Sequence, residues 1–112
     1  FWASWCAPCI KEMPYSKKIQ TEFDSDQLIY VYLSADRKDL PWENAIKRHE
    51  LNTGLHFRIE NAGYTTKMEE LNIPALPHYM IYHNGRLVNK DAPRPSEREK
   101  LIAEFNRYLG KQ

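Results

Sequence analysis

Two cysteines separated by two residues, Cys6 and Cys9, constrain this chain more than any other feature of its sequence. They follow apolar residues 1–3, which read as the end of a buried strand, and a turn at residues 4–5. They also open a segment with helical periodicity, so the pair is predicted to lie on the first turn of a helix. The unpaired amides and aligned peptide dipoles of such a turn favour an anion.

The spacing of the two cysteines predicts thiol–disulfide exchange. The thiolate is the nucleophile in this reaction, and a thiol at a helix N-terminus has a depressed pKa, so Cys6 is expected to attack. Cys9 lies one turn further into the helix and is expected to resolve the mixed disulfide. Ala7 and Pro8 between them carry no charge, and Pro8 fixes one backbone dihedral, which restricts how far the dithiol can relax.

Other interpretations of the cysteine pair stay open on these residues alone. Two buried, inert cysteines are one, although a disulfide across so short a loop constrains the unfolded chain little. A zinc site is another, but it needs two further ligands, there is no second cysteine pair, and His49 and His56 lie seven residues apart. The competing function is a module that holds a soft ion such as copper(I) on the dithiol with help from His78. Because a single histidine defines no metal site, we expect His78 to be an ordinary strand residue and the protein to need no metal or cofactor.

Length and composition set the broad class of the chain. Its 112 residues fit a single domain spanning residues 1–112, and 42% hydrophobic with 28% charged residues is ordinary for a globular protein. Sixteen basic and fifteen acidic residues are interspersed, which indicates no nucleic-acid partner. The apolar stretches are far shorter than the roughly 20 residues of a membrane span, so we expect no membrane contact from this segment, and a monomer. The sequence starts without Met inside an apparent strand, and we expect a longer chain with any targeting or anchoring residues upstream.

Hydrophobic periodicity and turn residues predict four helices. The first covers residues 8–23 and is expected to bend at Pro14, the second covers residues 39–51, and a short third one lies near residues 68–71 with Thr65 or Thr66 as its cap. The last follows a capping box made by Ser96 and Glu99 and ends at Gly110.

Four further segments read as strands. Residues 27–34 form a β-branched and aromatic run suited to a strand buried on both faces, and residues 55–59 form a shorter strand. Residues 79–82 and 86–88 flank Asn84 and Gly85, a strong signal for a type I′ hairpin. The order of elements predicts an α/β fold, a mixed sheet covered by helices on both sides with the hairpin as its antiparallel part.

The sequence also resembles a known family along nearly its whole length. The run FWASWCAPC at residues 1–9, with Pro14 five residues beyond the second cysteine, is similar to the active-site strand and helix of the thioredoxin superfamily. Residues 73–82 resemble that family's cis-proline loop and following strand, and they place the cis-proline at Pro77 rather than Pro74. The resemblance implies a thioredoxin-like mixed sheet flanked by helices that lacks the N-terminal part of the usual domain.

Within the superfamily, the insert at residues 36–72 and the acid at Glu12 resemble the TlpA/ResA branch of bacterial envelope thiol–disulfide oxidoreductases. In that branch an acid three residues after the resolving cysteine lies near the dithiol, which implies that Glu12 assists proton transfer; the alternative is an exposed glutamate on the helix surface. The branch also implies a place in the bacterial envelope, in the periplasm or anchored facing it. Protein disulfides or dithiols are then the partners, with reduction as the direction.

The resemblance further implies which residues contact the substrate. The family's cis-proline loop faces the dithiol and pairs with the substrate backbone like a short added strand, which assigns substrate binding to Leu76 and Pro77. The resemblance also assigns substrate binding to three residues around the cysteines, Trp5, Ala7 and Pro8. We expect Trp5 to cover the active-site surface and Trp2 to lie in the core. A peroxidase is disfavoured because that related branch places its reactive cysteine in a Pro- and Thr-rich loop, which this sequence lacks.

Overall fold

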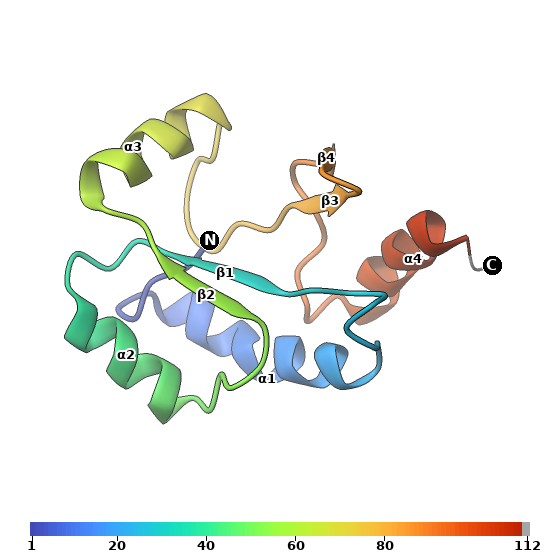
Figure 1. Ribbon diagram of the computed structural model, residues 1–112, viewed down its shortest axis with the longest axis horizontal. Coiled ribbons are helices and arrows are strands. Elements are labelled where there is room, and N and C mark those ends of the chain that lie inside the picture. Colours follow the sequence, from blue (N-terminus) through green and yellow to red (C-terminus); the bar gives the residue numbers. More distant parts are fainter. Residues whose placement is uncertain (111–112) are drawn as a thin grey trace.

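The computed structural model describes residues 1–110, except the side chains of residues 61–65. Helices and strands alternate along this part of the chain (Figure 1). In chain order they are α1 (Ala7–Thr21), β1 (Val31–Ser34), α2 (Asp39–Arg48), β2 (Leu55–Arg58), α3 (Asn61–Glu70), β3 (Ile81–His83), β4 (Arg86–Asn89) and α4 (Arg98–Leu109).

The strands form two small pairs joined by the first residues of the chain. β1 and β2 run parallel, whereas β3 and β4 are antiparallel, as predicted for the hairpin. Between the pairs, Trp2 bridges Ser34 in parallel, and the Phe1 carbonyl accepts a hydrogen bond of 3.3 Å from the His78 amide. The mixed arrangement with helices is the predicted α/β thioredoxin-like architecture.

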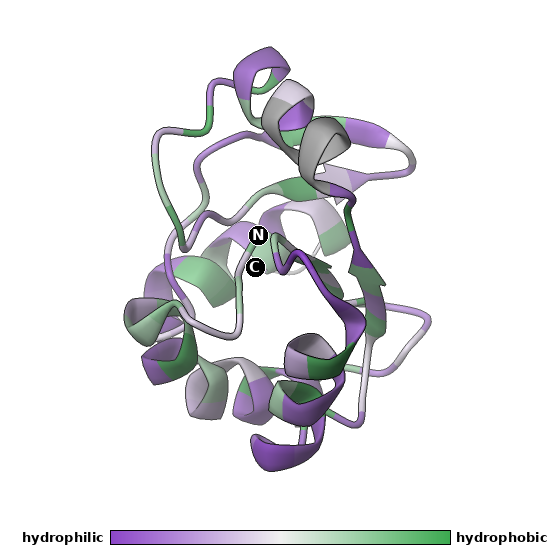
Figure 2. Cartoon of the chain, turned by 90° about the vertical axis from the view of Figure 1, so that its left-hand side faces the viewer, coloured by the Kyte–Doolittle hydropathy of each residue, from purple (hydrophilic) through white to green (hydrophobic). Residues whose placement is uncertain are grey.

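The helices lie on both sides of the β1–β2 pair. In Figures 1 and 2, α1 and α2 lie below these strands and α3 lies above them. One core cluster joins α1, α2 and β1 around Trp2, Cys9, Met13, Tyr32 and Leu51. A second cluster packs Ile19 at the far end of α1 against Leu101 and Phe105 of α4. The helix that carries the cysteines is therefore fixed at both ends by apolar contacts.

The inner face of α1 also carries polar residues, at the one-turn spacing of Glu12, Ser16 and Gln20. The Tyr30 hydroxyl donates to Ser16 Oγ over 3.0 Å, and Gln20 Nε2 donates to the Tyr32 hydroxyl over 2.6 Å. Burial raises the pKa of Tyr30 to about 12. These polar groups interrupt the apolar periodicity of the helix, whose backbone continues through Pro14.

The strand prediction for residues 27–34 was wrong in two respects. Only Val31–Ser34 is a strand, and it is buried on one face rather than both, because Val31 remains 47% exposed while Tyr32 is 5% exposed. Val31 lies opposite Leu55 in the register, and Leu33 lies opposite Phe57. Alternation along the two strands therefore puts these four apolar side chains on the outer face, where Leu55 and Phe57 are also exposed.

Helix boundaries differ from the predictions as well. α1 spans Ala7–Thr21, and α2 ends at Arg48, before the predicted residue 51. α3 already begins at Asn61, so Thr66 lies inside it rather than at its cap; the Thr65 side chain lies outside the described residues. The predicted capping box is also wrong, since the cap of α4 is Glu97 and it makes no side-chain capping bond. Gly110 ends α4 in the left-handed conformation, as predicted.

Candidate active site

Cys6 is the N-cap residue of α1 and forms a disulfide with Cys9. The Cα atoms of the pair are 5.2 Å apart, and the Cys9 amide donates to Cys6 Sγ over 3.3 Å. Pro8 occupies the first turn, where its missing N–H leaves no hydrogen bond unmade. The predicted placement at a helix N-terminus is confirmed, and one of the otherwise unpaired amides of that turn points at the sulfur of Cys6.

The residues around the disulfide divide into buried and exposed ones. Cys6 is 5% exposed and Cys9 is 1% exposed, so the N-cap residue is the more accessible of the two cysteines. Trp5 is 70% exposed beside them, whereas Trp2 is 2% exposed in the core, as predicted for both tryptophans. The peptide bond between Leu76 and Pro77 is cis, which confirms the choice of Pro77 over Pro74.

A cleft of about 450 Å³ opens beside Cys6. Its described lining is apolar apart from the cysteine and comes from four separate segments: Trp5, Cys6, Ala7, Pro8, Ala35, Met68, Ala75 and Leu76. The structure thus brings together all the predicted substrate-binding residues except Pro77, which does not line the cleft. Ala35, Met68 and Ala75 were missed. Ala75 lies within the recognised loop at residues 73–82, but an alanine after β1 and a methionine in α3 carry no sequence signal for a site.

Glu12 is buried, at 6% exposure, so the alternative of an exposed surface glutamate is wrong. Both of its carboxylate oxygens accept from Ser96, just ahead of α4: the amide donates to Oε1 and the hydroxyl to Oε2, each over 2.8 Å. Its negative charge adds to burial in raising the pKa values of Tyr30 and Tyr79. Sequence reasoning missed Ser96 as the partner of Glu12 because the same residue matched a capping motif.

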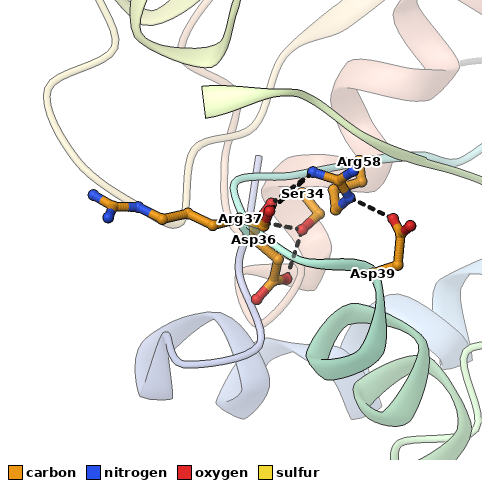
Figure 3. A network of polar contacts seen from close by, with 5 residues as sticks. All are labelled: Ser34, Asp36, Arg37, Asp39 and Arg58. Atoms are coloured by element: carbon orange, nitrogen blue, oxygen red, sulfur yellow. Dashed lines mark hydrogen bonds and ion pairs between the residues drawn. The ribbon is translucent and has the colours of Figure 1, made fainter. Parts of the chain in front are cut away.

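A second buried carboxylate, Asp36, lies close to the cysteine motif and was also missed. It is 2% exposed and accepts from the Ser4 amide over 3.0 Å, from the Ser4 hydroxyl, and from the Ser34 hydroxyl over 2.6 Å. Figure 3 shows how Arg58 lies over this segment, with Nη1 on the carbonyls of Asp36 and Arg37. An isolated aspartate after a strand matches no motif, so only the fold reveals this network.

His78 is buried and hydrogen-bonded, as predicted, but it lies in the segment before β3 rather than in a strand. It is 8% exposed, and its Nε2 lies 2.6 Å from the Lys90 carbonyl oxygen. Within residues 1–110, described side chains form no cluster of three or more potential metal ligands. None of the helices in the same part of the chain is long and apolar enough to cross a membrane.

Comparison with known proteins relates this chain to one family. A family model described as thioredoxin-like matches residues 1–86. The thiol–disulfide oxidoreductase ResA of Bacillus anthracis is 33% identical over 91 residues, and ResA of Bacillus thuringiensis subsp. konkukian is 28% identical over 90 residues. Each alignment covers 80% of this chain and 50% of the relative, so the chain spans about half the length of these relatives.

Solved structures agree with the sequence comparison. The solution structure of a proposed thiol–disulfide oxidoreductase from Bacteroides vulgatus superposes with a TM-score of 0.80 at 28% identity, covering 97% of this chain and 70% of that one. The thioredoxin domain of a thiol–disulfide oxidoreductase from the same organism has a TM-score of 0.81 at 23% identity, over 94% of this chain and 74% of that one. At that lower identity the second likeness supports the fold alone.

Proposed function

The chain belongs to the thioredoxin-like family, and on this premise we propose that it is a thiol–disulfide oxidoreductase acting on protein disulfides through Cys6 and Cys9. One observation carries the proposal: Cys6 stands at a helix N-terminus and lines an apolar cleft, and its sulfur accepts a hydrogen bond from the Cys9 amide. A thiolate formed at this position is stabilised by the amide and by the helix dipole. The cleft gives a substrate access to that sulfur.

The reaction starts from the reduced dithiol. The Cys6 thiolate attacks one sulfur of the substrate disulfide; the new sulfur–sulfur bond forms as the substrate bond breaks and its other sulfur leaves as a thiolate. Cys9 then loses its proton and attacks Cys6 Sγ, which closes the Cys6–Cys9 disulfide and releases the second substrate thiolate. Two electrons and the one proton of Cys9 pass to the substrate, whose second thiolate takes its proton from water, and an external dithiol restores the enzyme by the reverse exchange.

The remaining predicted residues take supporting roles in this proposal. Glu12 lies one helical turn beyond Cys9 on the buried side of α1, where a carboxylate is suited to accept the proton that Cys9 must lose. Leu76 and Pro77 present the backbone on which a substrate strand would pair. Trp5, Ala7 and Pro8 supply apolar surface for the substrate residues beside the target cysteine.

The proposed direction of electron flow and the proposed location rest on the similarity to relatives. Because this chain is similar to ResA proteins, we propose that it reduces partner disulfides and that it acts in the bacterial envelope. The direction is tested by titrating the Cys6–Cys9 pair against glutathione. A reductase requires a potential nearer that of thioredoxin, about −270 mV, than that of DsbA, about −120 mV.

The proposed activity is tested with insulin disulfides and dithiothreitol as the electron donor. The wild type is expected to accelerate insulin reduction well above dithiothreitol alone, and the Cys6→Ser variant is expected to match the uncatalysed rate. Equal activity in the two proteins would overturn the proposal.

A further inference from the structure

We propose that Asp36 is a positioning residue that sets the shape of the cleft beside Cys6 by tying Ser4 to the end of β1. This inference rests on the proposed function and deepens it, because it concerns how the protein substrate is held. The reaction itself makes no use of Asp36, which lies outside the cleft lining. Its burial therefore calls for another explanation.

Asp36 joins two segments that are far apart in the sequence. The Ser4 amide donates to both carboxylate oxygens, over 3.0 and 3.3 Å, and the Ser4 hydroxyl donates to Oδ1. On the other side, the hydroxyl of Ser34 in β1 donates to Oδ2 over 2.6 Å, and Ser34 Oγ accepts from the Asp36 amide over 2.9 Å. Hydrogen bonds to a buried carboxylate are stronger than neutral ones, so this joint is rigid.

The same joint connects two parts of the cleft lining. Trp5 follows Ser4 directly in the chain, Ala35 precedes Asp36 directly, and both Trp5 and Ala35 line the cleft. The backbone adds a further bond, because the Ala35 amide donates to the Trp2 carbonyl over 2.8 Å. When the bonds to Ser4 are lost, this backbone bond remains, and the Ser4–Trp5 turn is expected to shift relative to Ala35.

Burial of this charge has a cost that argues against a purely stabilising role. Removing a carboxylate from water is expensive, and apolar residues of similar volume often replace buried charged groups without loss of stability. The three donors from Ser4 and Ser34 offset that cost only in this geometry. The hydrogen bonds to Asp36 therefore hold the Ser4–Trp5 turn in one position.

Arg58 supports the segment from outside and supplies a matched control. Its Nη1 donates to the Asp36 carbonyl over 3.4 Å, and its Nε pairs with Asp39 Oδ1 over 2.6 Å (Figure 3). Asp39 is thus linked to the same network only through Arg58. Its side chain is 65% exposed, and the hydrogen bonds of Ser4 go to Asp36 instead. Asp39→Asn removes a charge nearby and leaves the bonds between Asp36 and Ser4 in place.

The test compares a protein disulfide with a small one in Asp36→Asn, Ser4→Ala, Asp39→Asn and the wild type. On the proposed function, insulin is expected to bind along the cleft, whereas the small hydroxyethyl disulfide is expected to need only the Cys6 sulfur. With dithiothreitol as donor, both Asp36→Asn and Ser4→Ala should lower kcat/KM for insulin by about tenfold, mainly through KM, the scale of losing one buried hydrogen bond. Turnover of hydroxyethyl disulfide should stay within about twofold of the wild type, and Asp39→Asn should change neither substrate.

Several outcomes would contradict the inference. Ser4→Ala keeps the buried charge and the backbone bond, so it decides the question if Asp36→Asn fails to fold. Equal losses on insulin and hydroxyethyl disulfide, or no loss on insulin, would overturn the role of Asp36 while leaving the proposed function intact. A wild type that turns over neither disulfide would instead overturn the proposed function, and the inference with it.

Discussion

Ser96 donates two hydrogen bonds to the buried carboxylate of Glu12, one from its amide and one from its hydroxyl, each 2.8 Å long. The two residues are 84 positions apart in the sequence. The contact joins the helix that carries the cysteines to the residues that precede α4. A carboxylate held by two donors has a fixed orientation, which a proton acceptor for Cys9 requires.

Glu12→Gln tests whether this carboxylate serves the chemistry. The amide keeps the volume of the side chain but accepts no proton, so the step in which Cys9 resolves the mixed disulfide should slow by on the order of 100-fold, the lower range for general base catalysis. Stopped-flow measurement of the resolving step against pH checks this. Glu99→Gln, an exposed glutamate on α4, is the matched control. Identical pH profiles for Glu12→Gln and the wild type would rule out the proposed role.

Ser96→Ala tests the stabilising part of the same contact. The variant removes the hydroxyl donor and leaves one oxygen of a buried carboxylate without its partner, which should lower the free energy of unfolding by about 1–3 kcal/mol. Urea denaturation of the oxidised protein measures the change. Ser25→Ala, at an exposed position, should change the free energy of unfolding by less than about 0.5 kcal/mol. A Ser96→Ala variant as stable as the wild type would show that the contact contributes little.

The raised pKa of Tyr30 should make the free energy of unfolding depend on pH in the alkaline range. Burial raises its pKa from 10.0 to about 12, so between these values the unfolded chain loses the phenolic proton while the folded protein keeps it. The unfolded state then binds fewer protons, and stability, fully present below pH 10, falls as the pH rises through this window, by on the order of 1–3 kcal/mol for this one group. Unfolding by urea at pH 9 and at pH 11 measures the loss.

Tyr30→Phe should reduce that pH dependence, because the buried hydroxyl is gone. Tyr15→Phe, at a side chain that is 48% exposed, should leave it unchanged. If both variants lose stability between these two pH values as steeply as the wild type, Tyr30 is not the source of the effect.

Two glycines with positive φ angles should respond differently to alanine. A Cβ at Gly54 would lie 2.7 Å from the Tyr30 carbonyl oxygen, whereas a Cβ at Gly85 in the hairpin turn meets nothing within 4 Å. Gly85→Ala should therefore cost only the conformational strain, about 1 kcal/mol, and Gly54→Ala should cost about 1–3 kcal/mol more. Thermal unfolding compares the two. Equal destabilisation would mean that the backbone near Tyr30 moves aside without cost.

Local patterns were sufficient for the parts of the site that depend on neighbours in sequence. The position of Cys6 at the N-terminus of a helix and the type I′ turn with positive φ angles at Asn84 and Gly85 were predicted from a few adjacent residues. The cis bond at Pro77 was predicted from the resemblance to the thioredoxin superfamily. The predicted capping box at Ser96 was wrong because the Ser96 hydroxyl donates instead to the distant Glu12 carboxylate, in a stronger, charge-assisted hydrogen bond.

Contacts between distant segments could not be predicted from one sequence. Asp36 stands alone after a strand, and only the fold shows that it binds Ser4. Ala35 follows β1 and Met68 lies in α3; the fold brings both to the cleft beside Cys6, and neither residue has chemistry that marks it. Residues that shape a cleft by position alone leave no signal in the sequence.

Trapping the mixed disulfide is the most direct test of whether Cys6 is the attacking thiol. In Cys9→Ser the resolving thiol is absent, so a partner protein disulfide attacked by Cys6 should remain covalently attached and appear on a non-reducing gel as an adduct that dithiothreitol releases. We expect this adduct with Cys9→Ser and none with Cys6→Ser. Adduct formation by Cys6→Ser as efficient as by Cys9→Ser, or by neither variant, would contradict the assignment of Cys6 as the attacking thiol.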